Sequence, residues 1–251
     1  MFDLIDFSFD EPAENLALEE CLLKPMLKAP LERPLVRIWE NRQTCIVLGR
    51  AEKASQQVQL DQCQKDNITV LRRTSGGGTV VHGIGNLNIS FFLPYEAFDG
   101  LKNIHQSYEI ILAWVRKALH QCCGVNTHMK GSSDLSIGDK KISGTAQARK
   151  RCGMLHHMTL LVNFNLDDIQ TYLREPEKRP DYRGERTHRN FVTTLHKEGF
   201  ELTRSALIKQ FLDILPAQQI QISQGILDEA RELAQLKYRQ DSWTLEGLDP
   251  V

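Results

Sequence analysis

Residues 72–83 form a glycine-rich segment whose side chains are suited to binding an anion. The segment reads RRTSGGGTVVHG. Three consecutive glycines let backbone N–H groups approach a phosphate or a carboxylate closely, and Arg73 can add a charge-assisted pair of hydrogen bonds. Ser75 and His82 can add directional hydrogen bonds. The alternative is a flexible hairpin turn, because glycine-rich turns are common, and the segment matches neither a P-loop nor a dinucleotide-binding fingerprint.

A second segment, residues 138–149, combines lysines with small residues. It reads GDKKISGTAQAR, so a turn presents two lysines and a strand of small residues follows. A lysine at the mouth of a pocket can neutralise an acyl phosphate or polarise its carbonyl, while small residues let a ligand lie against the backbone. Taken alone, the segment is more often a hairpin with solvated lysines.

The remaining histidine and cysteine pattern does not favour a metal site. His156 and His157 are adjacent, and adjacent side chains on a strand point to opposite faces, so we expect one to face a site while the other packs. The cysteines form no CxxC pair, and we expect most of them to be small buried residues rather than zinc ligands. They are Cys21, Cys45, Cys63, Cys122, Cys123 and Cys152.

The elements around these segments indicate an α+β fold. The clearest helix is Asn103–Cys123, whose apolar residues recur at helical spacing and which Gly124 ends. A first helix is expected at Glu11–Lys24, capped by Asp10 and stopped by Pro25. Strands grouped in runs favour a mixed or antiparallel sheet over a doubly wound one. The expected strands are Leu35–Trp39 and Thr44–Leu48 around an Asn41-Arg42 turn, Ile68–Arg72, Leu87–Leu93, two around Gly138-Asp139, and Thr159–Phe164, and two C-terminal helices are expected at Thr203–Leu215 and Ile226–Tyr238.

Composition limits the class of partner. The chain has 251 residues, 41% of them hydrophobic, and a net charge of −1, which fits one large domain without a global positive field for nucleic acid. The N-terminus lacks a basic targeting region, and no window reaches the roughly 18 apolar residues of a membrane span, so we expect a cytoplasmic protein. Residues 174–190 hold six basic and four acidic residues and predict either a solvated loop or a mobile functional loop.

Together these segments resemble the lipoate–protein ligase A family of the biotin/lipoate ligase superfamily. Residues 14–20, ENLALEE, are similar to its N-M-A-L-D-E helix, and residues 37–39 with 44–50 to its R-x-W…T-V-V-I-G-R strands. Residues 72–86, 139–146 and 155–161 are similar to R-R-x-S-G-G-G-A-V-x-H-D-x-G-N, D-R-K-V-S-G-S-A and F-H-H-G-T-L-L. The resemblance spans residues 10–240. It departs from the family at Gly83, where Asp is usual, and at Met158, which replaces a Gly.

The resemblance implies a class II synthetase/biotin ligase-like fold in which residues 1–251 form a single catalytic domain without a C-terminal accessory domain. Lys141, not Lys140, matches the catalytic lysine that contacts the acyl carbonyl and the adenylate phosphate. Other matched positions surround the acyl-adenylate, the nucleotide and the acyl pocket. They are Trp39, Arg73, Ser75, Gly76, Gly77, Gly78, His82, Asn86, Asp134, Ser143, Gly144, Ala146 and His157.

The reaction that the resemblance implies is ATP-dependent ligation with Mg²⁺. Lipoate or octanoate becomes an acyl-adenylate, and the acyl group passes to a lysine of an apo-lipoyl domain in an E2 subunit or an H protein. A separate accessory protein could supply the missing domain, in which case preformed acyl-AMP should react faster than lipoate with ATP.

Two rival readings remain. One is an acyltransferase that takes the chain from acyl carrier protein, or from another lipoylated protein. Several such transferases hold the chain on a cysteine, and residues 128–134 contain none. The other is a non-enzymatic binding paralogue, against which Lys141 and the three glycines argue.

Overall fold

The computed structural model describes residues 1–175 and 181–249, and within them two β-sheets. The larger sheet has the strand order β11-β1-β2-β6-β10-β9-β8-β7 and the smaller one the order β4-β3-β5. Strand β1 runs parallel to β11 and β2, β3 runs parallel to β4, and the other neighbours are antiparallel. The strands are β1 (Phe2–Asp6), β2 (Leu35–Trp39), β3 (Cys45–Leu48), β4 (Thr69–Arg72), β5 (Val80–His82), β6 (Asn86–Pro94), β7 (His128–Lys130), β8 (Asp134–Ile137), β9 (Lys140–Arg149), β10 (Gly153–Leu161) and β11 (Ala217–Gln219).

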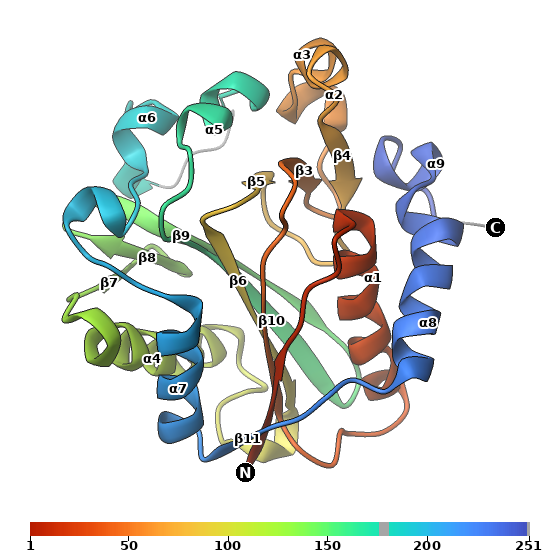
Figure 1. Ribbon diagram of the computed structural model, residues 1–251, viewed down its shortest axis with the longest axis vertical. Coiled ribbons are helices and arrows are strands. Elements are labelled where there is room, and N and C mark those ends of the chain that lie inside the picture. The colour runs from red at the N-terminus through yellow and green to blue at the C-terminus, as the bar shows by residue number, and fades with distance from the viewer. Residues whose placement is uncertain (176–180, 250–251) are drawn as a thin grey trace.

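Helices cover both faces of the larger sheet, as Figure 1 shows. Helices α4 (Ile104–Cys123) and α7 (Arg204–Ile214) pack on one face, and α1 (Pro12–Leu23) and α8 (Gln224–Leu233) on the other. The short helices α2 (Ala54–Gln57), α3 (Leu60–Lys65), α5 (Asp167–Tyr172) and α6 (His188–Phe191) gather at one end, beside the smaller sheet. The remaining elements are η1 (Lys24–Leu27), η2 (Tyr95–Ala97), η3 (Asp181–Arg183), η4 (His196–Glu198), η5 (Ala234–Tyr238) and α9 (Asp241–Thr244).

Helix α4 confirms the clearest prediction from the sequence. The side chain of Asn103 accepts a hydrogen bond from the backbone N–H of Gln106 and caps the N-terminus. Gly124 ends the helix with φ 73°, a left-handed conformation that glycine adopts without strain. Ile111, Val115 and other apolar residues at helical spacing are buried in the core beneath α4 and α7. The α+β prediction with a mixed sheet is likewise confirmed.

Several predicted boundaries are wrong, each for a local reason. Asp10 does not cap α1, because Glu11 is its N-cap residue and makes no side-chain cap bond. The predicted end before Pro25 is confirmed, since α1 ends at Leu23, and Pro25 then fits the first turn of the 3₁₀ helix η1. Strand β10 begins at Gly153, six residues earlier than expected, and ends at Leu161. The helix predicted at Ile226–Tyr238 begins at Gln224 and consists of α8 followed by the π-helix η5.

Two further predictions need qualification. The strands on either side of the Asn41-Arg42 turn, β2 and β3, belong to different sheets, so the chain crosses between the sheets there. Part of the predicted loop, residues 176–180, lies outside the described residues, and the rest of it contains η3 and part of α6.

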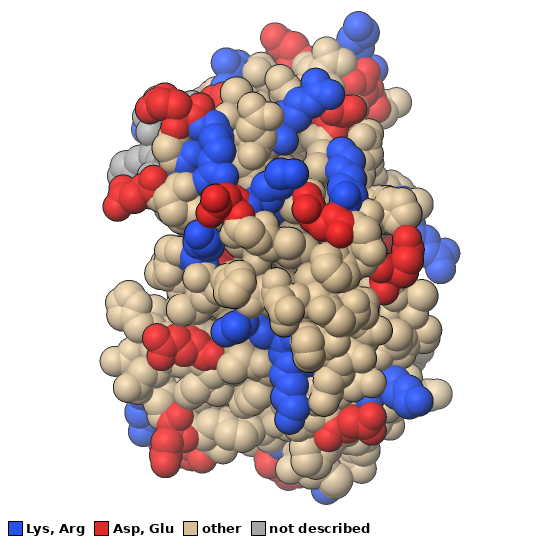
Figure 2. All heavy atoms as spheres, turned by 90° about the vertical axis from the view of Figure 1, so that its left-hand side faces the viewer, with Lys and Arg blue, Asp and Glu red and all other residues tan. Residues whose placement is uncertain are grey.

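Two features concern the class of partner: the distribution of charged residues on the surface, and the length and hydrophobicity of the helices. Figure 2 shows one side of the molecule, on which lysines and arginines are interspersed with aspartates and glutamates instead of forming a region of one sign. Among the described residues, no helix is both long enough and apolar enough to cross a bilayer.

Candidate functional site

Two cavities meet at Lys141. The first, of about 140 Å³, lies between the two sheets beneath α1, and the second, of about 220 Å³, extends toward α5 and α6. Both are lined by Gly78, Thr79, Val80, Lys141, Gly144 and Thr159. A ligand that fills both cavities would therefore pass the side chain of Lys141 at their border.

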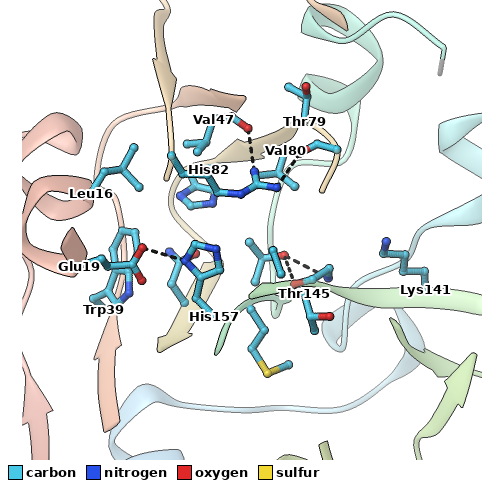
Figure 3. Close-up of a pocket in the computed structure, with 17 residues that line it drawn as sticks. Leu16, Glu19, Trp39, Val47, Thr79, Val80, His82, Lys141, Thr145 and His157 are labelled. Atoms are coloured by element: carbon cyan, nitrogen blue, oxygen red, sulfur yellow. Dashed lines mark hydrogen bonds and ion pairs between the residues drawn. The ribbon is translucent and has the colours of Figure 1, made fainter. Parts of the chain in front are cut away.

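The first cavity has an apolar body and different chemistry at its two ends. Leu16, Val47 and Met158 are among the side chains that line it. Figure 3 shows Lys141 at one end and Trp39 with Glu19 at the other, with His157 between them. A medium-length acyl chain would fit with its carboxyl group near the ammonium of Lys141 and its tail toward Trp39.

A buried hydrogen-bond chain forms the inner wall of this cavity. Trp39 Nε1 donates to Ser90 Oγ at 2.8 Å, and Ser90 Oγ donates to Glu19 Oε1 at 2.5 Å. The second carboxylate oxygen of Glu19 lies 2.8 Å from Nδ1 of His157. Burial by itself raises the pKa of Glu19, but His157, Ser90 and the charge of Arg37 outweigh it and leave the pKa below its ordinary value. Glu19 is thus a buried carboxylate that its neighbours keep ionised.

The wall continues into an arrangement that resembles a Ser-His-acid triad. His157 Nε2 lies 2.7 Å from Ser75 Oγ, while Nδ1 faces Glu19. Ser75 is only 1% exposed, it is absent from the described residues that line the two cavities, and its Oγ accepts a bond from Arg73 Nε at 2.9 Å. A substrate in the cavity could not reach this hydroxyl, so we assign the three side chains to the wall and not to nucleophilic catalysis.

The guanidinium of Arg73 shapes the glycine-rich loop. It is buried and donates to the carbonyls of Val47, Gly76 and Gly78 at 3.2, 2.7 and 2.8 Å. Burial lowers its pKa to about 10. Arg73 also lines the first cavity, so the prediction that it binds a phosphate stays a prediction, although most of its donors here bind the carbonyls of its own loop. Gly77 takes φ +84°, a conformation that favours glycine.

A close backbone contact explains why residue 49 is a glycine. A Cβ on Gly49 would lie 1.8 Å from the carbonyl oxygen of Gly77, so any larger residue there would displace the loop. Arg72 ties the same region to the C-terminal segment, donating to the carbonyls of Gly49 and Trp243 among others. The loop is held from both sides before any ligand arrives.

The two adjacent histidines face opposite sides of β10, as predicted. His157 lines the first cavity, whereas His156 is fully buried beside Gln147 and the ring of Tyr108. Burial lowers the pKa of His156 to about 3. His82, which also lines the first cavity, is buried next to Asn41, and burial lowers its pKa to about 3 as well. Both imidazoles are therefore neutral at physiological pH.

The second cavity contains polar atoms that need a partner. Asn86 is 1% exposed, and its Nδ2 donates to the carbonyl of Val81 at 2.8 Å. Its Oδ1, and the Oγ1 of Thr79, have no hydrogen-bond partner among the described residues. Buried polar atoms without a partner cost about 1–3 kcal/mol each, and because neither atom is exposed to the cavity, a ligand could bond them only if these side chains turned.

Of the two adjacent lysines, only Lys141 reaches the cavities. Its Nζ lies 2.9 Å from Asp134 Oδ1, and its side chain is 24% exposed. Lys140 instead pairs with Glu198 at the surface and is 53% exposed. The distinction drawn from the sequence between the two lysines is therefore matched by their positions in the structure.

The structure brings most, but not all, of the predicted site residues together. Those that line a cavity are Trp39, Arg73, Gly78, His82, Asn86, Lys141, Gly144, Ala146 and His157. Those absent from the linings are Ser75, Gly76, Gly77, Asp134 and Ser143. Ser143 is fully buried and is not brought to the site, whereas Asp134 adjoins it through Lys141.

Three residues at or beside the site were missed. Glu19, Thr79 and Tyr182 were given no role in the sequence analysis, although Glu19 and Thr79 lie within the quoted motifs. Glu19 could have been found from one signal: it is a charged residue within a helix whose neighbouring residues are mostly apolar and buried.

Comparison with known proteins gives one family and consistent relatives. The model of the lipoyl protein ligase A/B catalytic domain matches residues 11–215. A protein of Aeropyrum pernix, named as a candidate lipoate-protein ligase A, is 29% identical over 247 residues, covering 94% of this chain and 90% of that protein.

Solved structures give the same picture of the fold. A bi-partite lipoate protein ligase of Thermoplasma acidophilum, described with its E2 lipoyl domain, superposes with a TM-score of 0.82 and 25% identity over 100% of this chain and 97% of its own. A lipoate-protein ligase A bound with ATP superposes with a TM-score of 0.80 and 23% identity, covering 98% of each chain.

Proposed function

The chain belongs to the family of lipoyl protein ligase A/B catalytic domains, and from this premise we propose that it activates lipoate with ATP and transfers the lipoyl group to a protein lysine. The observation that carries the proposal is the meeting of two cavities at Lys141. The first suits an acyl chain, and the second, which is lined by polar side chains such as Gln57, Asn86 and Arg174, suits a nucleotide. An acyl-adenylate is the molecule that would occupy both at once.

The proposed reaction has two steps. The carboxylate of lipoate attacks the α-phosphate of ATP and forms lipoyl-AMP with release of pyrophosphate. The amine of an acceptor lysine then attacks the acyl carbonyl, forms an amide and releases AMP. Lys141 would stabilise the negative charge that develops on the phosphate in the first step and on the carbonyl oxygen in the second. The protein would contribute position and charge, without a covalent intermediate on its own side chains.

A divalent cation would fit at the border of the cavities. Magnesium bound with nucleotides is commonly held by one or two carboxylates together with phosphate oxygens. Asp134 supplies one carboxylate next to Lys141, and within residues 1–175 and 181–249 no group of three potential ligands exists that would hold a metal alone. Bound Mg²⁺ would neutralise phosphate charge, while Asp134 would be the residue of this chain that holds it.

The proposed acceptor is a lipoyl domain of the E2 or H-protein kind. The support is the Thermoplasma ligase, which is described as bi-partite and together with its E2 lipoyl domain, and whose fold this chain matches over its length. We propose the same partner class here, and a second protein that assists adenylation. Because the reaction uses ATP, we propose that it takes place in the cytoplasm. Octanoate remains an alternative acyl group.

The decisive experiment follows the intermediate. Purified protein is incubated with ATP, Mg²⁺ and lipoate, and lipoyl-AMP is detected by mass spectrometry. Synthetic lipoyl-AMP is then supplied with an apo-lipoyl domain, and the modified lysine is measured. We expect transfer from lipoyl-AMP to be faster than from lipoate and ATP without a second protein. Failure of both routes would contradict the ligase assignment, and equal rates would contradict the need for a second protein.

The acyltransferase alternative has less support. A transferase that holds the chain on a cysteine needs a thiol in contact with the acyl cavity. None of the cysteines is among the described residues that line the two cavities. Burial raises the pKa of Cys45 to about 12, which makes this residue, the nearest in sequence to the cavity strand residue Val47, a poor nucleophile.

A further inference from the structure

Asp134 is held from two sides by groups that lie far apart in the sequence. Its Oδ1 lies 2.9 Å from Lys141 Nζ, and its Oδ2 accepts a hydrogen bond from the hydroxyl of Tyr182 at 2.6 Å. Tyr182 comes from η3, 48 residues further along the chain. The carboxylate therefore connects the lysine at the border of the cavities to a segment that the motifs do not include.

The phenol of Tyr182 is itself held in place. Its ring lies 5.3 Å from the ring of Phe191, and a Cβ on Gly131 would lie 3.4 Å from its edge, so small residues at the β7–β8 turn make room for it. Arg186 donates to the carbonyls of Tyr182 and Asp139 and ties this segment to the β8–β9 turn. The hydroxyl of Tyr182 is the donor in this hydrogen bond, because the carboxylate of Asp134 that it contacts can only accept.

This geometry restricts the side-chain rotations of Asp134 and Lys141. The carboxylate of an aspartate rotates readily about its last bond, and a lysine has four rotatable side-chain bonds. With Oδ2 engaged by Tyr182, Oδ1 of Asp134 is directed at Lys141. Without the hydroxyl, both carboxylate oxygens could exchange places, and the ammonium would lose its fixed anchor.

We propose that Tyr182 is a positioning residue, which acts through Asp134 to fix Lys141 Nζ at the border between the acyl and nucleotide cavities. The inference rests on the proposed function, because it requires Lys141 to act at that border. It assigns a role to the described part of the charged segment 174–190, which the matched motifs leave unexplained. The far wall of the acyl cavity, at Trp39 and Glu19, is not involved.

The first test removes the hydroxyl alone. In Tyr182→Phe we expect kcat to fall about tenfold, which corresponds to the loss of one hydrogen bond to a charged group, while KM for lipoate stays within about twofold. Tyr172→Phe is the matched control, since its hydroxyl also donates to an aspartate, Asp66, at 3.2 Å, but it is not among the described residues that line either cavity. An unchanged kcat in Tyr182→Phe would overturn the proposal.

The second test asks whether Tyr182 acts through Asp134 or only supports its own segment. Tyr182→Phe is measured in an Asp134→Ala background with lipoyl-AMP as the substrate, because Asp134→Ala would also remove the proposed Mg²⁺ ligand from the ATP-dependent step. If the effect passes through Asp134, the added loss should be under about twofold. A full additional tenfold loss would mean that Tyr182 acts on the segment alone, and the proposal would be wrong even if Tyr182→Phe also lowered the melting temperature.

Lys141→Ala separates this inference from the function on which it rests. Retained ligation in Lys141→Ala would remove the basis of the proposed function. Lost ligation in Lys141→Ala together with normal kcat in Tyr182→Phe would refute only the role of Tyr182.

Discussion

The inner wall of the acyl cavity and the border around Lys141 are built in opposite ways. At the inner wall, Glu19 and Ser90 are buried, His157 is 12% exposed, and Glu19 joins the other two by hydrogen bonds, so no ligand is needed to satisfy them. At the border, Lys141 is 24% exposed, and beyond it Asn86 Oδ1 and Thr79 Oγ1 lack partners among the described residues. The hydrogen bonds of the wall are made within the protein, whereas the border presents a partly exposed ammonium that a ligand can contact.

The difference separates the tasks of shape and chemistry. A rigid wall whose hydrogen bonds are all made cannot rearrange to strengthen its contacts during a reaction, so it defines which chain fits. The border can exchange an ion pair for contacts with phosphate and carbonyl oxygens, which is what stabilisation of a transition state requires. Mutations should therefore affect activity at the border and stability at the wall.

The largest effect is expected at the border. Lys141→Ala should lower the rate of lipoyl transfer by about 1000-fold, because it removes the charge that faces both cavities. Its effect on the free energy of unfolding should be under about 1 kcal/mol, since the ion pair with Asp134 is partly exposed. Transfer of the lipoyl group is measured by mass spectrometry of the acceptor domain.

Lys140→Ala is the matched control, because it removes a neighbouring ammonium that pairs with Glu198 at the surface. We expect near-normal transfer. If the two variants behaved alike, the border would not be where the chemistry occurs.

At the inner wall of the acyl cavity, a mutation should lower the stability of the fold. Glu19→Gln removes the charge that His157 and Arg37 face in a buried site, and we expect the free energy of unfolding to fall by about 3 kcal/mol. The adjacent Glu20→Gln is the control, because Glu20 binds Lys237 and Tyr238 but is 26% exposed, and it should cost about 1 kcal/mol. Urea unfolding measures both. Equal losses would show that the wall is no more tightly coupled than the helix surface.

The sequence predicted which residues lie at the border better than it predicted the construction of the wall. Lys141 and the glycine-rich loop lie in continuous motifs, so their types and spacing were sufficient to place them together. The hydrogen bonds of Arg73 could not be predicted, because they go to carbonyls that only the folded loop brings together. Tyr182 meets Asp134 across 48 residues, and nothing local in the charged segment marks that tyrosine. Long-range contacts of this kind depend on how the sheets and loops pack.

In the fold too, local features could be predicted from the sequence and long-range ones could not. Helix α4 was predicted because its cap, apolar spacing and terminal glycine are all local. That β2 and β3 enter different sheets could not be predicted, since a turn between two apolar strands fits a hairpin equally well.

A smaller loss of stability is expected in acid, from two buried histidines outside the wall. The pKa values of His82 and His156 are lowered to about 3 by burial, so between about pH 3 and 6.5 the unfolded chain binds protons that the folded chain does not. Stability should therefore be present above about pH 6.5 and fall below it, by about 1.4 kcal/mol per pH unit for each histidine. Urea unfolding at pH 7.5, 6.5 and 5.5 measures the slope.

His156→Gln should flatten this dependence, whereas removal of the exposed His105 should not, because folding leaves that imidazole in solvent. A slope that stays the same without His156 would mean that its burial does not control the acid sensitivity.

The smallest effect is expected from the cysteines, and Cys152 gives the sharpest case. Basic residues 149–151 precede it, and it is partly exposed, which are features of a reactive thiol. Yet it lies in the β9–β10 turn, where its N–H donates to the carbonyl of Met26, and it is not among the described residues that line either cavity. Cys152→Ser should therefore transfer lipoyl groups at the wild-type rate from both lipoyl-AMP and lipoate with ATP. A folded but inactive variant, together with an acyl-thioester on Cys152 in the wild-type protein by mass spectrometry, would favour the acyltransferase and place chemistry outside the border.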